Sequence, residues 1–198
     1  MVRIAVLVSG GGTNLQALID SEKRGENPYG RISLVVSSRP GVYALTRAEG
    51  AGIETAVVSR KAFECAEDYD EALLEVLKSH DIDLVILAGF LSVLGEKLVK
   101  AYPDRIINVH PALIPSFCGK GMYGLAPHKA ALERGCKVTG ATVHLVNEEC
   151  DGGPILFQKA VDIQPDDTPE SLQKRVMEEA EWVLLPKAAA MISRRISE

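Results

Sequence analysis

The stretch "VLVSGGGTNLQAL", residues 6–18, decides the fold class. An apolar run enters three consecutive glycines, and a helix-like pattern of apolar residues follows them. A buried strand that passes through a tight glycine turn into a helix is typical of the first unit of an α/β protein. The stretch therefore predicts a parallel sheet with helices packed against it.

The same alternation continues along the first half of the chain. Short β-branched, apolar runs predict strands over Arg3–Val8, Ile32–Ser37, Thr55–Val58, Leu84–Ala88 and Ile106–Val109. Amphipathic stretches between them predict helices near Asn14–Ser21, Tyr43–Ala51, Glu67–Ser79 and Glu96–Ala101. Nearly continuous apolar strands such as "DLVILAG", residues 83–89, are typical of a sheet covered on both faces. The sequence thus predicts an α/β fold with a doubly wound, mostly parallel sheet.

The texture of the sequence changes after Pro111. Residues 111–127 carry glycine or proline every few positions and predict a loop, and a helix is expected over His128–Arg134. Two β-rich runs, residues 139–146 and 155–163, follow and are joined by "NEECDGG". They predict an antiparallel C-terminal strand pair.

A last helix is expected after "DDTPESLQKRV", residues 166–176. Thr168 stands at the N-cap position and Pro169 in the first turn, where proline is favoured. The helix runs toward Arg195, and a kink is expected at Pro186. No repeat, low-complexity segment or linker interrupts the chain, so one domain is expected.

Composition and charge restrict the class of protein. A net charge of −5 argues against a general nucleic-acid binder, because the phosphate backbone would be repelled. No apolar run approaches the roughly 20 residues of a membrane span, and the N-terminus reads as a strand rather than a signal peptide. The four cysteines form no C-x-x-C pair and no histidines have metal-ligand spacing. We therefore expect a cytoplasmic protein with reduced thiols and no metal.

Glycines 10–12 predict an anion-binding loop. Glycine adopts backbone angles closed to other residues, and the unpaired N–H groups of the following helical turn would face the loop. Thr13 or Asn14 is expected to cap that helix. Leu15 stands where a dinucleotide fingerprint has its last glycine, and the lysine of a P-loop is missing. The expected ligand is a simple phosphate monoester, and the alternative is a tight turn without a ligand.

A polar cluster is expected at the end of the fifth predicted strand. Asn108 and His110 stand two apart, so their side chains point to the same sheet face, at the edge where open α/β sheets bind ligands. An asparagine amide can donate to a developing oxyanion, and histidine titrates near neutral pH. Asp151, which two glycines follow, would keep the His110 ring protonated if it lay beside it. Taken alone, His110 also fits a core histidine and Asp151 a turn residue.

The other histidines and two of the cysteines leave alternatives open. His80 ends a helix and is expected in solvent, and His128 is expected to cap or line its helix. His144 lies in a β-rich run and faces either the site or the core. Cys118 or Cys150 is an alternative nucleophile, although no sequence feature activates either thiol.

Four motifs occur in order: "AVLVSGGGTNLQAL", "LVILAGF", "INVHPALIPSFCGKG" and "TGATVHLVNEECDGGPI". With them the chain resembles the phosphoribosylglycinamide formyltransferase family, folate-dependent enzymes of purine biosynthesis, over nearly its whole length. The resemblance implies a Rossmann-like formyltransferase fold in a single domain, residues 1–198. Residues 1–105 would form a phosphate-binding half, and residues 106–198 a catalytic and folate-binding half.

The resemblance implies transfer of a formyl group from 10-formyltetrahydrofolate, a co-substrate, to the amine of glycinamide ribonucleotide. Asn108 and His110 would stabilise the tetrahedral oxyanion. Asp151 would keep His110 protonated and relay a proton from the attacking amine to the leaving nitrogen. The acceptor phosphate would lie on Gly12, Thr13 and Asn14.

The resemblance also implies further binding residues. A glutamate of the last helix would contact the acceptor: the spacing before Pro186 favours Glu181, with Glu178 and Glu179 as alternatives. The folate would bind through Asn108 and two segments, namely Leu91, Ser92, Val93 and Leu94, and Asn147, Glu148, Glu149, Cys150 and Asp151.

Two departures from the family pattern concern the folate tail. Ala66 and Ser92 stand where the family often has arginines. The tail is therefore expected to be held weakly, or by other cations such as Lys120 or Arg60. The loop over residues 116–124 is longer than in shorter-loop members, and we expect it to supply Lys120 or to cover the site.

Other functions remain as alternatives. A formyltetrahydrofolate hydrolase normally carries a regulatory domain, and a methionyl-tRNA formyltransferase a basic RNA-binding one; this acidic chain shows neither. A non-catalytic phosphosugar sensor would need no set such as Asn108, His110 and Asp151. The expected partners are glycinamide ribonucleotide and folate, without nucleic acid or membrane, and the chain is expected as a monomer or homodimer.

Overall fold

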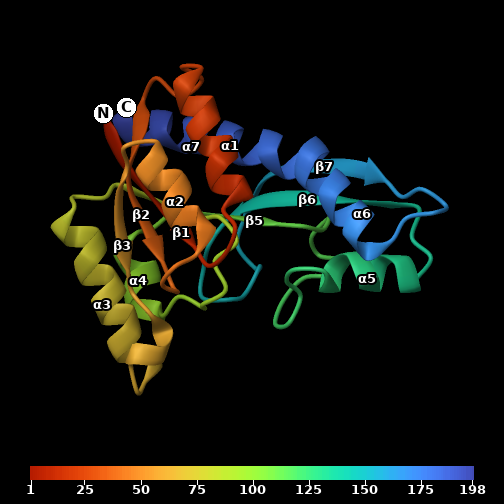
Figure 1. Ribbon diagram of the computed structural model, residues 1–198, viewed down its shortest axis with the longest axis horizontal. Helices are drawn as coiled ribbons and strands as arrows, with labels where there is room; N and C mark the ends of the chain where they lie inside the picture. The colour runs from red at the N-terminus through yellow and green to blue at the C-terminus, as the bar shows by residue number, and fades with distance from the viewer.

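One seven-stranded sheet, in the order β3-β2-β1-β4-β5-β6-β7, runs through the computed structural model, which describes residues 1–198 (Figure 1). Its strands are β1 (Val2–Val8), β2 (Gly30–Ser37), β3 (Glu54–Val57), β4 (Leu84–Leu87), β5 (Ile106–His110), β6 (Val138–Leu145) and β7 (Ile155–Asp162). The first five strands pair in parallel, whereas β6 runs antiparallel to both β5 and β7. The predicted mostly parallel α/β sheet with an antiparallel C-terminal pair is confirmed.

Helices cover both faces of the sheet. They are α1 (Thr13–Lys23), α2 (Tyr43–Gly50), α3 (Ala66–Ser79), α4 (Glu96–Ala101), α5 (Ala126–Glu133), α6 (Pro169–Val176) and α7 (Trp182–Ser197), with a 3-10 turn η1 at Arg60–Ala62 and a π-helical turn η2 at Met177–Glu181. One hydrophobic core joins the sheet to α1, α2, α6 and α7, and a second joins it to α3 and α4. The sheet is therefore doubly wound.

Strand β1 shows why this sequence builds two cores. Ile4, Val6 and Val8 pack into the core under α1 and α7, whereas Ala5 and Leu7 pack into the core under α3. Successive side chains of a strand point to opposite faces. A strand between two covered faces must therefore be apolar at every position, as this one is from Ile4 onward.

The glycine turn differs from the expected cap. Gly12 occupies the N-cap position of α1 with φ 72°, and neither Thr13 nor Asn14 caps the helix with its side chain. A Cβ on Gly12 would lie 2.7 Å from Cβ of Ala44 on α2, so both the left-handed backbone and the close helix require glycine there. The predicted N-cap role of Thr13 or Asn14 is wrong, because Gly12 already makes the turn and Thr13 is helical.

The C-terminal helices agree with the prediction at the start of α6 and differ from it at a π-helical turn, Met177–Glu181. Thr168 caps α6 as expected, since its Oγ1 accepts from the Ser171 N–H at 3.2 Å while the Ser171 Oγ accepts from the Thr168 N–H at 2.9 Å. Pro186 lies inside α7, and the chain leaves α-helical geometry earlier, in the π-helical turn η2. Because Pro186 has no N–H, it leaves the intrahelical bond to the Trp182 carbonyl unmade.

Helix α5 starts two residues before the expected His128, at Ala126. Pro127 lies in its first turn, where a missing N–H leaves no bond unmade. Pro127, which the sequence placed at the end of the loop, therefore belongs to the helix.

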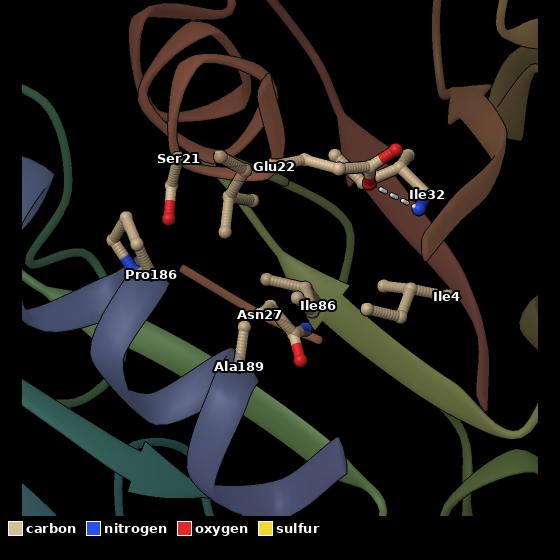
Figure 2. A pocket seen from close by; sticks show the side chains of 9 residues that line it. Ile4, Ser21, Glu22, Asn27, Ile32, Ile86, Pro186 and Ala189 are labelled. Carbon is tan, nitrogen blue, oxygen red and sulfur yellow. Dashed lines mark hydrogen bonds between the residues drawn. The ribbon is translucent and has the colours of Figure 1, made fainter. Parts of the chain in front are cut away.

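A small cavity of about 10 Å³ lies between α1, α7 and the sheet, lined in part by Ile4, Ser21, Asn27 and Pro186 (Figure 2). Such a volume holds about one water molecule. Ile4 is near the start of β1, so the cavity is at the amino ends of the parallel strands, away from the glycine loop. It is a gap in packing and too small for a substrate.

No helix of the chain is both long and apolar enough to span a bilayer.

Gly140 of β6 provides a test of the sheet packing. A Cβ there would overlap the Lys159 carbonyl oxygen and lie 2.8 Å from Cδ2 of Leu113. We expect Gly140→Ala to lower the free energy of unfolding by about 1–3 kcal/mol, because overpacking a filled space costs that much. Urea denaturation followed by circular dichroism measures it.

Gly50→Ala in α2 is the matched control. No atom lies within 4 Å of a Cβ added at Gly50, so we expect a gain of about 0.4–1 kcal/mol from the reduced freedom of the unfolded chain. Equal effects of the two substitutions would contradict the close approach of β6 and β7 at Gly140.

Candidate active site

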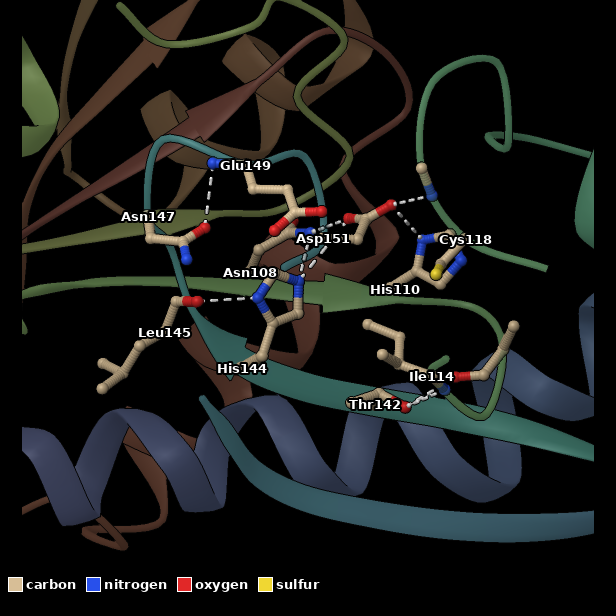
Figure 3. A network of polar contacts seen from close by, with 12 residues as sticks. Asn108, His110, Ile114, Cys118, Thr142, His144, Leu145, Asn147, Glu149 and Asp151 are labelled. Atoms are coloured by element: carbon tan, nitrogen blue, oxygen red, sulfur yellow. Dashed lines mark hydrogen bonds and ion pairs between the residues drawn. The ribbon is translucent and has the colours of Figure 1, made fainter. Parts of the chain in front are cut away.

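Asn108, His110 and Asp151 converge at the carboxyl end of β5 (Figure 3). Asn108 and His110 extend from the same face of β5, and Asp151 arrives from the loop between β6 and β7. Nδ2 of Asn108 lies 3.4 Å from Oδ1 of Asp151, and Nδ1 of His110 lies 3.5 Å from its Oδ2. The His110 and Asp151 side chains are only 4% and 9% exposed. The structure thus brings together three residues that the sequence singled out separately.

The loop that carries Asp151 turns sharply. Asp151 itself has φ 56°, a left-handed conformation that is uncommon without glycine. A Cβ on Gly152 would lie 2.7 Å from the Glu149 side chain, and one on Gly153 would overlap the Leu145 carbonyl oxygen. The glycine pair therefore lets the loop fold back close to the end of β6, and this places the carboxylate over β5.

Asp151 is held as a carboxylate. Burial works to raise its pKa, but the adjacent His144 ring, a hydrogen bond from the Gly119 N–H and nearby His110 outweigh burial and lower the pKa below its usual value. The Gly119 N–H donates to Oδ2 at 2.8 Å. A buried negative charge is therefore available beside the His110 ring.

The His110 ring has an acceptor at each nitrogen. Nε2 lies 2.8 Å from the Phe117 carbonyl oxygen, and Nδ1 faces the carboxylate of Asp151. A ring with a proton on each nitrogen satisfies both acceptors, whereas a neutral ring would leave a lone pair against one of them. Phe117, like Asp151, is left-handed, with φ 51°. Two unusual backbone positions thus supply the two partners of this histidine.

Two residues that the sequence reasoning missed hold the turn after β5. Thr142, opposite His110 in the β5–β6 register, donates from Oγ1 to the Ala112 carbonyl at 2.7 Å and accepts from the Ile114 N–H at 3.1 Å. Gln158 on β7 donates to Thr142 Oγ1 and to the Ile114 carbonyl, both at 3.0 Å. Polar residues within apolar strands were the available signal, but the strand register was needed to connect them.

His144, left open between site and core, belongs to the site. Its side chain is 2% exposed, and its Nε2 lies 3.2 Å from Nδ2 of Asn108 and 3.6 Å from Oδ1 of Asp151. His80 is elsewhere, against the Val76 carbonyl and Glu54. His128 is fully buried in α5, where burial and the charge of His110 lower its pKa to about 4.

The surroundings of Cys118 and Cys150 do not activate either thiol as a nucleophile. Burial and the negative charge of Asp151 both raise the pKa of the Cys118 thiol and of the Cys150 thiol. A thiol with a raised pKa is a poor nucleophile near neutral pH. No group of His, Cys, Asp and Glu side chains is arranged to hold a metal ion.

A second pair of polar side chains lies beside the glycine turn. Nδ2 of Asn14 donates to Oε2 of Glu181 at 2.7 Å, and the two residues are 8% and 6% exposed. Burial raises the pKa of Glu181 to about 7, against a smaller lowering effect of the Asn14 hydrogen bond. Glu178 and Glu179, in the same π-helical turn, are exposed. Of the three glutamates, only Glu181 is buried.

Arg47 of α2, which the sequence reasoning also missed, contacts the glycine turn. Its Nε donates to the Gly11 carbonyl at 2.9 Å, its Nη1 to Oε1 of Gln16 at 2.9 Å, and its guanidinium lies 4.8 Å from the Tyr43 ring centre. No carboxylate pairs with it. The turn therefore carries a positive charge that no anion of the chain neutralises.

The two segments expected at the folate flank this site. Residues 91–94 follow β4, and the Leu91 N–H donates to Oγ of Ser9, beside the glycine turn, at 2.9 Å. Leu91 and Val93 are exposed by 47% and 81%. In the segment of residues 147–151, Oδ1 of Asn147 accepts from the Glu149 N–H at 3.0 Å.

The candidate cations for the folate tail lie on different segments. Arg60, in η1, donates to the Phe63 carbonyl at 2.9 Å and lies 6.0 Å from the Tyr69 ring centre. Lys120 is exposed in the loop next to Gly119, whose N–H binds Asp151. Neither cation forms an ion pair, and Ala66 begins α3.

The fold and the site define an α/β protein with a mostly parallel sheet and a buried Asn–His–Asp cluster at the carboxyl end of β5. Residues 2–188 match the model of the formyl transferase family, and the chain belongs to this family. It is 40% identical over 186 residues to phosphoribosylglycinamide formyltransferase of Haemophilus influenzae, which covers 94% of this chain and 84% of the relative. It is 44% identical over 192 residues, 97% of the chain, to the trifunctional purine biosynthetic protein adenosine-3 of Gallus gallus.

Solved structures show the same relation. The crystal structure of glycinamide ribonucleotide transformylase 1 from Symbiobacterium toebii superposes with a TM-score of 0.92 and 40% identity, covering 98% of this chain and 89% of that one. The chain spans only 18% of the length of the Gallus gallus relative and 14% of the corresponding Drosophila melanogaster protein. The fold of this chain is therefore shared both by proteins of similar length and by parts of much longer ones.

The raised pKa of Glu181 makes stability depend on pH. In the unfolded chain this carboxyl titrates near its ordinary 4.5, and in the folded chain near 7. The folded state binds the extra proton between these values, so the stabilisation is fully present below pH 4.5 and is lost as the pH rises through about 7. Glutamine at this position has no carboxyl to titrate, so Glu181→Gln avoids this loss. We therefore expect the difference in unfolding free energy, Glu181→Gln minus wild type, to increase by about 3 kcal/mol between pH 4.5 and pH 8.

Urea denaturation of both proteins at the two pH values measures this difference, and the comparison cancels the other titrating groups. Glu178→Gln, an exposed neighbour, serves as the control and should show no such change. A Glu181→Gln effect that is the same at both pH values would contradict the buried, protonated carboxyl.

Proposed function

We propose that this chain transfers the formyl group of 10-formyltetrahydrofolate to the amine of glycinamide ribonucleotide in purine biosynthesis. The observation that carries the proposal is the convergence of Asn108, His110 and Asp151 at the same sheet edge as the glycine turn. Strands β1, β4 and β5 are neighbours in the sheet, so the segments after them meet at one edge. Family membership and the named relatives support the same reaction.

The acceptor phosphate binds at the start of α1. The first N–H groups of a helix have no partners within it and attract an anion, and Arg47 adds a fixed positive charge beside them. Glu181, hydrogen-bonded to Asn14, contacts the acceptor. The phosphate-binding residues are Gly12, Thr13 and Asn14.

The chemistry takes place over the end of β5. The acceptor amine forms a bond to the formyl carbon, and the carbonyl oxygen becomes negatively charged. Doubly protonated His110 and the amide of Asn108 stabilise that oxygen, since donors aimed at developing charge lower the barrier most. Asp151 takes a proton from the attacking amine and returns it to the folate nitrogen as the carbon–nitrogen bond to the donor breaks.

The donor binds beside this centre. Two segments, residues 91–94 after β4 and residues 147–151 after β6, offer backbone groups to its pterin, and the partly exposed apolar side chains of Leu91 and Val93 support a flat ring. With Ala66 and Ser92 in place of arginines, Arg60 or Lys120 takes the negative tail. This assignment includes no metal.

Further parts of the proposal concern organisation. Residues 1–105 act as the phosphate-binding half of one domain, 1–198, and residues 106–198 as the catalytic and folate-binding half. The protein works in the cytoplasm, as a monomer or homodimer, on small substrates rather than on nucleic acid or at a membrane.

The experiment that tests the reaction follows tetrahydrofolate release by absorbance, with and without glycinamide ribonucleotide. We expect release only with the acceptor, and a fall in kcat of about 10²–10³ for Asn108→Ala, the usual effect of removing one oxyanion donor. Release without the acceptor would identify a hydrolase. No release under either condition would identify a binding protein and overturn the proposal.

Arg47 tests the phosphate site. We expect Arg47→Gln to raise the acceptor KM about tenfold or more, because a hydrogen bond to a charged group contributes about 1.5–3 kcal/mol. The donor KM should not change, since that ligand lies across the site. Arg31→Gln, an exposed arginine at the opposite ends of the strands, is the control. An equal rise in both KM values would place Arg47 outside the phosphate site.

A further inference from the structure

His144 lies directly under the proposed reaction centre. In the β5–β6 register it is the residue opposite Asn108, as Thr142 is opposite His110. Its ring is buried and its Nε2 faces Asn108 and Asp151 (Figure 3). The proposed mechanism assigns this ring no task.

The surroundings of His144 determine which ring nitrogen carries the proton. Nδ1 lies 2.8 Å from the Leu145 carbonyl oxygen, which only accepts hydrogen bonds. The proton of a neutral ring is therefore on Nδ1. Nε2 then presents a lone pair toward β5.

This lone pair determines how the amide of Asn108 is turned. Nδ2 of Asn108 lies 3.2 Å from Nε2 of His144 and 3.4 Å from Oδ1 of Asp151. Both neighbours are acceptors, so the NH2 end of the amide fits between them, and a carbonyl oxygen there would be repelled by both. Of the two orientations of the amide, only one is compatible with a neutral His144 and an ionised Asp151.

The contact with Asp151 is not sufficient to fix this orientation. At 3.4 Å it is longer than a typical N–H···O hydrogen bond, and Asp151 is held by a loop rather than by the sheet. His144 is on β6, which pairs with β5 through the backbone. The acceptor that best defines the amide is therefore the imidazole.

We propose that His144 is a positioning residue that acts through Asn108. Its Nε2 lone pair holds the amide nitrogen, so that the NH2 end of Asn108, and not its carbonyl oxygen, is available to the developing oxyanion. This role rests on the proposed formyl transfer, because it is the orientation of the Asn108 donor that His144 supplies. The ring touches neither substrate nor reacting atom.

Two substitutions separate this role from mere filling of space. The amide of glutamine reaches the place of Nε2, whereas that of asparagine reaches only the place of Nδ1. H144Q keeps an acceptor for Asn108, and H144N keeps the contact to Leu145 but loses that acceptor. We expect kcat to fall about 10–100-fold in H144N with both KM values within about twofold, the effect of an unpaired buried donor, and H144Q to recover most of the loss.

A double-mutant cycle tests the route through Asn108. In the Asn108→Ala background, H144N should lower kcat by less than about twofold further, because residues that act together are not additive. Full additivity would overturn the proposal, as would equal rates for H144Q and H144N.

A measurement on the wild type needs no activity, and uses H144Q only to assign the signal. Long-range ¹H–¹⁵N spectra of the histidine rings, with His144 assigned by its loss in H144Q, report which nitrogen is protonated. We expect a proton on Nδ1 and none on Nε2; a proton on Nε2 would overturn the positioning role. A wild type without formyl transfer would instead overturn the proposed function, and the spectrum would still decide the tautomer.

Discussion

The buried carboxylate of Asp151 is the interaction on which the site depends. A carboxylate so little exposed is unfavourable unless donors surround it. The Gly119 N–H, the Asn108 amide and the His110 ring supply these donors, and the His144 ring packs beside them at 3.6 Å. Through these contacts one charge connects the loop after β5, strand β5, strand β6 and the loop after β6, so that segments far apart in the sequence form one arrangement.

The antiparallel strand β6 makes this arrangement possible. In its register with β5, Leu145 lies opposite Ile107 and Thr142 opposite His110, so β6 ends near the start of β5. The following loop must therefore double back to reach His110, and it can do so because Gly152 and Gly153 allow close approach to Glu149 and Leu145. A parallel β6 would have carried its polar residues in the opposite order along β5.

Unusual backbone conformations occur where this site needs them. Phe117 and Asp151 are both left-handed, and they provide the two acceptors of the His110 ring. Left-handed conformations of residues other than glycine are unfavourable and persist only where the surrounding contacts determine them. Here the side chains of Thr142 and Gln158, which lie on sheet strands, hydrogen-bond the backbone of Ile114, three residues before Phe117. The sheet thereby holds the loop in place.

The sequence by itself determined the doubly wound sheet, the glycine turn, and the shared face of Asn108 and His110, because apolar runs and strand alternation are local properties. Only the tertiary structure decided that Gly12, not Thr13 or Asn14, starts α1, that Glu181 is buried while Glu178 and Glu179 are exposed, and that His144 belongs to the site. Arg47, Thr142 and Gln158 were missed for the same reason. Periodicity specifies which face a side chain occupies, but the identity of its neighbours depends on strand order, register and helix packing, which contacts distant in the sequence establish.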